Sequence, residues 1–173
     1  GDVARIFLKR LKNQGNVTCV DPNKFMIEKG KKKLDDLNNI RWHVSGAEKL
    51  PFKDNTFDIY SVSFGVRNFS NTKMAMKEAH RVLKRGGRFI CLEFSKVENE
   101  MLDKLYKKYS KIIPILGKYI VGDDEPYDYL IKTINEFYDQ NTFKKIIEDS
   151  GFSNVEYRNI SGGIVAIHSA WKI

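Results

Sequence analysis

Apolar and polar positions along the chain follow the two periods of regular secondary structure. From Asp2 to Lys12, apolar residues recur every three to four positions, which predicts an amphipathic helix. The run at 16–20, NVTCV, predicts a short strand, and residues 23–34 predict a second helix with Met26 and Gly30 on its buried face. A third apolar run at 40–44 predicts another strand.

The same alternation continues to the C-terminus. Further strands are predicted at 57–64, 88–94, 155–160 and 163–171, and further helices at 71–84 and 139–150. Gly162 and Gly163 predict a two-residue hairpin turn between the last two strands. Because strands and helices alternate, we predict an α/β fold: a doubly wound, mainly parallel sheet that ends in an antiparallel hairpin.

The segment at about 98–138 interrupts this alternation. It carries helical patterns, a broad apolar stripe and many tyrosines, so we interpret it as a helical, lid-like insertion within one domain spanning 1–173. Such an insertion could cover a hydrophobic ligand or rest against a membrane. Simple packing of the stripe on the sheet explains the pattern equally well.

Composition limits the functional classes. The chain has 173 residues, 42% of them apolar, which suits one domain with a real core. The net charge of +8 favours anionic partners, but the lysines are spread along the chain and form no clustered basic groove, so we do not expect nucleic acid binding. Cys19 and Cys91 lie inside apolar runs and predict buried thiols, so we expect no metal site.

The stretch from Phe57 to Phe69 is the best candidate for a functional strand. Its apolar strand opens into a loop that contains Gly65, Arg67 and Asn68. Open α/β sheets bind ligands at the carboxyl ends of their strands, where this loop is expected to lie. A core strand followed by a polar turn is the alternative explanation.

Asp21 directly follows the strand predicted at 16–20. A carboxylate at a strand tip, about 20 residues beyond a glycine turn, is typical of a group that accepts hydrogen bonds from ribose hydroxyls. The alternative is that Asp21 caps the following helix, although Asn23 can do so equally well. Gly1 is consistent with the end of a glycine-rich turn, and Gly46 and Ala47 would permit close approach of a flat ligand.

These motifs resemble class I S-adenosylmethionine-dependent methyltransferases, which are Rossmann-like. The resemblance rests on Asp21, GAEKLPF at 46–52, RVLKRGGRF at 81–89 and the terminal hairpin. SFGVRN at 63–68, LEFSK at 92–96, GDDEPYDYL at 122–130 and SGGIVAIH at 161–168 are more specific. They are similar to the quinone-biosynthesis C-methyltransferase family, which methylates polyprenyl-methoxy-benzoquinol or demethylmenaquinol. The resemblance covers essentially the whole chain.

The sequence departs from the family pattern in two places. Arg85 stands where the pattern usually has Pro, in a turn. The family's first strand and most of its glycine loop are expected upstream of Gly1, so we expect the chain to be N-terminally truncated and to lack part of its cofactor site.

The resemblance implies roles for individual residues. S-adenosyl-L-methionine would be the cofactor, held by Gly1, Asp21, Gly46, Ala47 and Ser63. Arg67 and Asn68 would act in catalysis, while Tyr127 and Tyr129 would line the ring pocket. Arginine is a poor base, but it can stabilise a developing phenolate or polarise a water.

The same resemblance suggests partners and a location. We expect a lipid-soluble quinol as substrate, peripheral membrane association, other quinone-biosynthesis enzymes as partners, and a homodimer. The expected location is the matrix side of the mitochondrial inner membrane, with the bacterial cytoplasm as the alternative. A methyltransferase for another lipid and a non-catalytic scaffold subunit are the competing functions.

Overall fold

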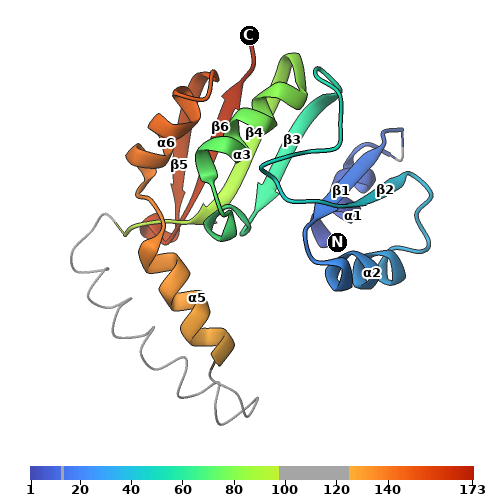
Figure 1. Ribbon diagram of the computed structural model, residues 1–173, viewed down its shortest axis with the longest axis horizontal. Coiled ribbons are helices and arrows are strands. Elements are labelled where there is room, and N and C mark those ends of the chain that lie inside the picture. Colours follow the sequence, from blue (N-terminus) through green and yellow to red (C-terminus); the bar gives the residue numbers. More distant parts are fainter. Residues whose placement is uncertain (13, 98–124) are drawn as a thin grey trace. The chain divides into compact units, whose positions relative to one another are not determined.

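The computed structural model describes residues 1–12, 14–97 and 125–173, and for residues 125–128 it describes the backbone alone. The described chain divides into two compact units, Gly1–Phe52 and Lys53–Ile173. Each unit is built around its own sheet (Figure 1). Helices and strands follow one another in both units, which confirms the predicted α/β class.

The first unit contains a parallel pair of strands, β1 (Val17–Asp21) and β2 (Ile40–Val44). Helix α1 (Asp2–Arg10) precedes the pair, and α2 (Lys24–Lys33) connects the two strands. The side chain of Asn23 accepts hydrogen bonds from the first backbone N–H groups of α2. Asn23 is therefore the N-cap that the sequence suggested.

The core of the first unit is formed by five buried apolar side chains: Ala4, Leu8, Ile27, Leu34 and Leu50. Gly30 lets α2 approach β2 closely, because a Cβ there would lie 2.6 Å from the Trp42 ring. The prediction that Met26 faces inward is wrong, since it is 51% exposed. The neighbouring Ile27 shares one helical face with Gly30 and Leu34 and takes the inward position.

The second unit contains four strands in the order β3-β4-β6-β5. β3 (Phe57–Ser63) and β4 (Leu83–Phe94) are parallel, whereas β5 (Ser153–Ile160) and β6 (Val165–Trp171) form an antiparallel hairpin that pairs with β4 through β6. The predicted terminal hairpin is thus confirmed. β4 begins earlier than the predicted start at residue 88, because Leu83 pairs with Phe57 across an irregularity in the ladder.

Helices α3 (Thr72–Val82) and α6 (Gln140–Glu148) contact each other and pack on the same face of this sheet (Figure 1). Asn71 and Asp139 cap their N-termini, as their side chains accept the hydrogen bonds of Met74 N and Thr142 N. Ala79 and Val82 of α3 and Phe143 and Ile147 of α6 are buried, as is Phe89 of β4. Helix α5 (Glu125–Glu136) completes the described helices of this unit; residues 98–124 of the predicted insertion lie outside the described residues.

The turn of the terminal hairpin differs from the prediction. The ladder ends at the pair Ile160 and Val165, so four residues, not two, connect the strands. Ser161, Gly162 and Gly163 have φ values of 50°, 69° and 96°. Three successive residues with positive φ do not fit a two-residue turn, in which at most the two central residues have positive φ.

The expectation of one continuous sheet is wrong for the described strands, because β1 and β3 share no ladder. A pattern of apolar runs predicts strands but does not predict which of them share a ladder, because neighbours along the chain need not be neighbours in a sheet.

His168 gives the second unit a predicted dependence on pH. Its ring is 2% exposed, contacts Phe143 and Tyr157, and pairs through Nε2 with the carbonyl of Gln140 at 3.0 Å. Burial lowers the pKa of His168. As the pH falls through the unfolded pKa of about 6.5, the unfolded chain takes up a proton that the folded chain resists, so stability is lost towards acid.

We predict that His168→Gln removes this contribution. Between pH 7.5 and 5.5 the wild-type chain should lose stability more steeply than the variant, by up to about 1.4 kcal/mol per pH unit below the unfolded pKa. Urea unfolding at a series of pH values measures both slopes. Equal slopes would show that His168 titrates alike in the folded and unfolded chains.

Candidate functional site

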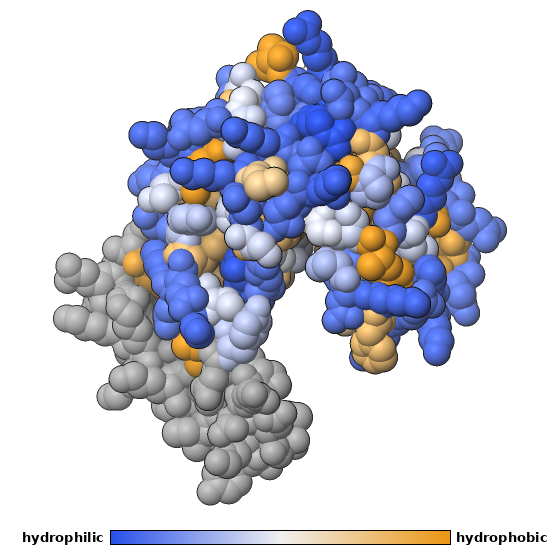
Figure 2. All heavy atoms as spheres, in the orientation of Figure 1, coloured by the Kyte–Doolittle hydropathy of each residue, from blue (hydrophilic) through white to orange (hydrophobic). Residues whose placement is uncertain are grey.

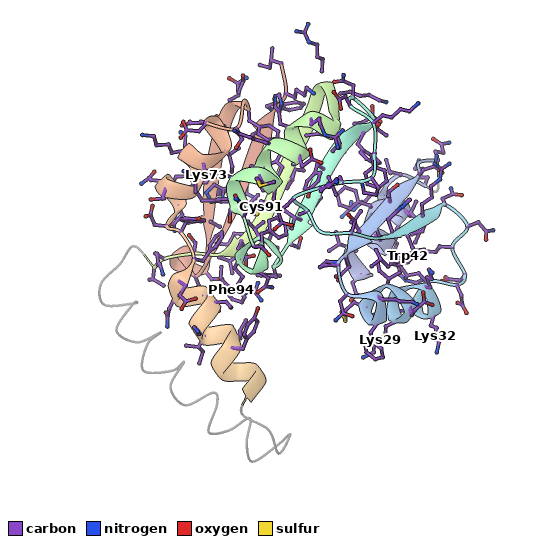
Figure 3. All side chains as sticks on the ribbon, in the orientation of Figure 1. Lys29, Lys32, Trp42, Lys73, Cys91 and Phe94 are labelled. Atoms are coloured by element: carbon purple, nitrogen blue, oxygen red, sulfur yellow. The ribbon has the colours of Figure 1, made fainter. Side chains whose placement is uncertain are left out.

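The carboxyl ends of β3 and β4 support a tight turn from Phe64 to Asn68. Phe64 has φ of 54°, an unusual value for a bulky residue, and its N–H donates to Leu92 O at 2.8 Å. Its ring packs on that of Phe94, with the ring centroids 4.9 Å apart. Phe94 lies at the end of β4 (Figure 3). Backbone strain that is held in place by such contacts is concentrated at functional sites.

Arg67 and Glu93 form a buried ion pair beneath this turn. Arg67 Nη1 lies 2.9 Å from Glu93 Oε1, and the two side chains are 10% and 2% exposed. Arg67 Nη1 also donates to Phe64 O at 2.6 Å, and the guanidinium lies over the Phe94 ring, 5.4 Å from its centroid. Glu93 additionally accepts from the backbone N–H groups of Arg67 and Phe94 at 3.3 and 2.9 Å. One carboxylate therefore joins the turn to β4.

Asn68 follows Arg67 in the one-turn helix η1 (Val66–Asn68) and contacts α5. Tyr129 on α5 donates from its hydroxyl to Asn68 Oδ1 at 3.1 Å. Lys96, just beyond β4, holds the other end of α5, since its ammonium donates to the carbonyls of Ile134 and Asn135 at 3.3 and 2.6 Å. The structure thus brings Arg67, Asn68 and Tyr129 to one end of the sheet.

Ser63 is the last residue of β3, pairs with Leu92 and is half-buried. It lies one residue before the strained Phe64, at the edge where the resemblance places it. The backbone of Tyr127 lies on α5, and its side chain is outside the described residues.

In the first unit, the other predicted residues gather at the carboxyl ends of β1 and β2. Asp21 Oδ1 accepts from Asn23 N at 2.8 Å, and Ser45 N donates to Asp21 O at 3.2 Å. Within the described chain, Asp21 Oδ2 accepts no hydrogen bond. Gly46 and Ala47 follow directly after Ser45. Asp21 therefore has an oxygen free for a ligand, and Asn23 does the capping.

Gly1 and Gly46, the two glycines of the predicted cofactor site, have different surroundings. It is the N-cap of α1, where its carbonyl accepts from Arg5 N, and a Cβ there would meet Leu34 at 2.9 Å. A Cβ at Gly46 would meet the carboxylate end of Glu48, also at 2.9 Å. Gly46 is thus open to a ligand if the flexible Glu48 side chain moves.

Glu93 is the site residue that the sequence interpretation missed. A usable signal was present, because a carboxylate stands inside the apolar run RFICLEF at 88–94. Carboxylates are almost never fully buried unless they are paired. The partner could not be read from the sequence, since Arg67 lies 26 residues away and meets Glu93 only through the parallel pairing of β3 and β4.

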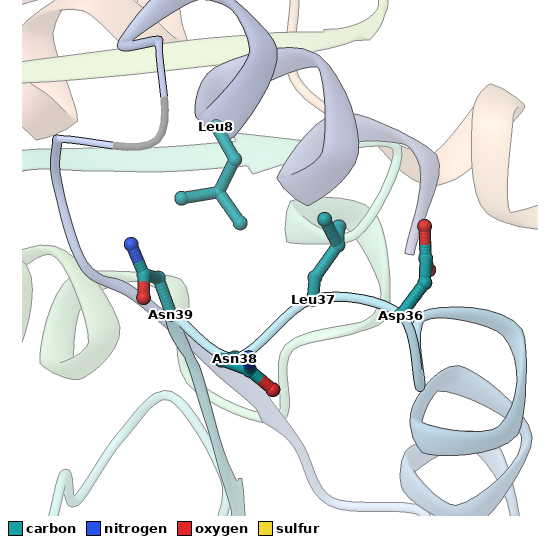
Figure 4. A pocket seen from close by; sticks show the side chains of 5 residues that line it. All are labelled: Leu8, Asp36, Leu37, Asn38 and Asn39. Carbon is teal, nitrogen blue, oxygen red and sulfur yellow. The ribbon is translucent and has the colours of Figure 1, made fainter.

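A hollow in the first unit is not a candidate active site. It has a volume of about 160 Å³ and is lined by Leu8, Asp36, Leu37, Asn38 and Asn39 (Figure 4). Asn38 and Asn39 precede β2, so the hollow lies at the amino end of that strand. Ligands of open α/β sheets bind at the opposite end.

The described residues carry little that suggests other chemistry. The face seen in Figure 2 is mainly hydrophilic, with small separate apolar patches. Among the described residues, no cluster of three or more His, Cys, Asp or Glu side chains is placed to hold a metal. Within the same part of the chain, no helix combines the length and the apolar character needed to cross a membrane.

Comparison with known proteins identifies the family. Residues 1–172 match the ubiE/COQ5 methyltransferase family. The chain belongs to this family. It is 48% identical over 180 aligned residues to the ubiquinone/menaquinone biosynthesis C-methyltransferase UbiE of Rickettsia bellii, covering all of this chain and 73% of the relative. It is also 48% identical to the mitochondrial 2-methoxy-6-polyprenyl-1,4-benzoquinol methylase of Danio rerio, covering 92% of this chain and half of that protein.

Solved structures support the class I methyltransferase fold. A SAM-dependent methyltransferase from Aquifex aeolicus superposes with a TM-score of 0.68 at 20% identity, over 98% of this chain and 78% of that one. A possible histamine N-methyltransferase from Thermotoga maritima gives a TM-score of 0.67 at 18% identity, with the same coverage. At these identities the likeness concerns the fold alone. Family and fold together imply use of S-adenosylmethionine.

The Arg67–Glu93 pair should be far more costly to break than an exposed pair in the same unit. We predict that Arg67→Met lowers the free energy of unfolding by about 3–5 kcal/mol, because it leaves the Glu93 charge buried without its partner. Lys84→Met removes the exposed pair with Asp58, at 2.8 Å, and should cost less than about 1 kcal/mol. Urea unfolding compares the two variants, and equal losses would contradict the importance given to burial.

Proposed function

We propose that this chain carries the S-adenosylmethionine-dependent C-methylation of a quinol ring, a polyprenyl methoxy-benzoquinol or demethylmenaquinol. Membership of the ubiE/COQ5 family sets the reaction class. The observation that carries the residue assignment is the placement of Arg67, buried beneath the turn at the carboxyl end of β3, with Asn68 and Tyr129 beside it. That edge is where such sheets bind their ligands.

In this proposal the ring carbon becomes nucleophilic when a phenolic hydroxyl loses its proton. S-adenosylmethionine, when bound, would supply the methyl group from its sulfonium and would leave as the neutral thioether. Water would take the phenolic proton and, after methyl transfer, the proton of the methylated ring carbon. Arg67 stabilises the phenolate by charge and hydrogen bonding, because a guanidinium stays protonated throughout. Asn68, hydrogen-bonded to Tyr129, orients the ring oxygens, and Tyr127 is proposed to line the same pocket.

Cofactor binding is proposed for the carboxyl edge of β1 and β2. For Ser63, at the end of β3, a cofactor contact is proposed separately, from the resemblance. Asp21 Oδ2 would accept from a ribose hydroxyl, and Gly46 and Ala47 would lie along the adenine. The free carboxylate oxygen of Asp21 supports this role. Gly1 is proposed to contribute through its position before α1.

We also propose peripheral membrane association, since the quinol substrate is lipid-soluble, together with other quinone-biosynthesis enzymes as partners and a homodimer. The matrix side of the mitochondrial inner membrane is one proposed location, in line with the name of the Danio rerio relative. The bacterial cytoplasm is the other, in line with the Rickettsia relatives.

Asp21→Ala tests the cofactor site. The substitution leaves ribose hydroxyls without their acceptor, so we predict that S-adenosylmethionine affinity in the full-length protein falls by about 1–3 kcal/mol. Asp58→Ala, at the amino end of β3, is the matched control and should leave affinity unchanged. Calorimetry measures both. Equal affinities for wild type and Asp21→Ala would return Asp21 to a purely local role beside the Asn23 cap.

Arg67→Ala tests the catalytic assignment. Methyl transfer to a short-tailed quinol, followed in single turnovers, should slow by about 10²–10³-fold, the scale for loss of one preorganised donor. Arg67→Lys should recover only part of the rate, because the planar fork is lost. Cofactor affinity should hardly change in either variant. A near wild-type rate in Arg67→Ala would refute catalysis by Arg67 and leave cofactor binding unaffected.

A further inference from the structure

The guanidinium of Arg67 uses only part of its hydrogen-bonding capacity. Nη1 donates to Phe64 O and to Glu93 Oε1. Nε is fully buried and has no hydrogen-bond partner among the residues that the structure describes. A buried donor without a partner is rare in folded proteins and requires an explanation. The unused donor lies in a side chain that is 90% buried, at the sheet end where ligands bind.

The geometry of the contact with Glu93 explains why Arg67 Nε donates no hydrogen bond to a described residue. Arginine presents its donors as a rigid planar fork, and carboxylates commonly take two of them at once. Here Glu93 Oε1 takes Nη1, while Oε2 turns to the backbone N–H of Arg67. The carboxylate therefore fixes the guanidinium from one side and leaves the Nε–H free for an acceptor.

Glu93 is itself held firmly. It accepts from Phe94 N as well as from Arg67, so its position is set by β4 and by the turn together. The Phe94 ring lies against the guanidinium, which limits tilting of the plane. Small displacements of a reacting group cost large factors in rate, so a clamp of this kind has a direct effect on catalysis.

From these contacts we infer that Glu93 is a positioning residue for methyl transfer: it holds Arg67 through Nη1 so that the buried Nε–H donates to the ionising oxygen of the quinol. This inference rests on the proposed function, because it takes the quinol oxygen as the acceptor. It goes further in naming the donor atom and in giving Glu93 a role that operates through Arg67.

Glu93→Gln in the full-length protein is the first test. The amide keeps the length of the side chain, but one of its two accepting atoms becomes a donor that faces another N–H. Single-turnover methyl transfer should slow by about 10–100-fold, the usual effect of losing an outer partner that orients a functional group. Affinity for S-adenosylmethionine should not change. Glu93→Asp keeps the charge with a shorter reach and should fall between wild type and Glu93→Gln.

The matched control is Glu78→Gln. Glu78 also pairs with an arginine in the same unit, with Arg81 Nε at 2.7 Å, but within α3 and away from the turn. Its rate of methyl transfer should equal that of the wild type.

The decisive comparison uses Arg67→Met with and without Glu93→Gln. If Glu93 acts through Arg67, the double variant should transfer methyl groups at the rate of Arg67→Met alone, because coupled residues are not additive. It should also be more stable than Arg67→Met, since the unpaired buried charge is gone. Rate stays the informative readout, as a purely structural role would change stability only.

Three outcomes would overturn the inference: a wild-type rate in Glu93→Gln, an equal slowing by this substitution with and without Arg67, or a rate of Glu93→Asp below that of Glu93→Gln at equal stability. Failure of the proposed function would look different. In that case the wild-type protein itself would transfer no methyl group to the quinol.

Discussion

The ion pair between Arg67 and Glu93 is the contact on which the candidate site depends. Each charge would be costly to bury alone, and the pair is tolerated because Glu93 also satisfies two backbone N–H groups. The same contacts hold the strained turn after β3 against the end of β4. The Glu93 carboxylate thus has two roles in this account: it stabilises the turn, and it orients the Arg67 guanidinium.

Each unit carries its own set of candidate site residues. The first carries polar and small groups at the ends of β1 and β2, where Asp21 Oδ2 accepts no hydrogen bond from the described residues. The second holds the Arg67 guanidinium and the Asn68 amide at the ends of β3 and β4, where the quinol ring is proposed to bind. Both sets lie at the carboxyl ends of parallel strands, as expected for a class I methyltransferase fold. Membership of the ubiE/COQ5 family identifies methyl transfer as the reaction class for these groups.

Local signals in the sequence predicted much of this arrangement. Apolar periodicity and caps such as Asn23 and Asp139 located the helices, because these features depend on neighbouring residues. The motif around Arg67 was visible for the same reason. Sequence could not predict that Arg67 meets Glu93, which depends on strand register, or that the terminal turn has four residues, which depends on backbone angles. Nor could periodicity alone show which strands share a sheet, since neighbours in sequence need not be neighbours in a ladder.

The central claim is that Arg67 stabilises an anionic ring oxygen, and it can be measured without turnover. A chromophoric phenol that binds in place of the quinol would report its own ionisation by absorbance as the pH is varied. The account predicts that the pKa of the bound phenol lies below its value in water, and that Arg67→Met abolishes most of this shift. A bound phenol with an unchanged pKa in the wild-type protein, or an equal shift in Arg67→Met, would contradict the account.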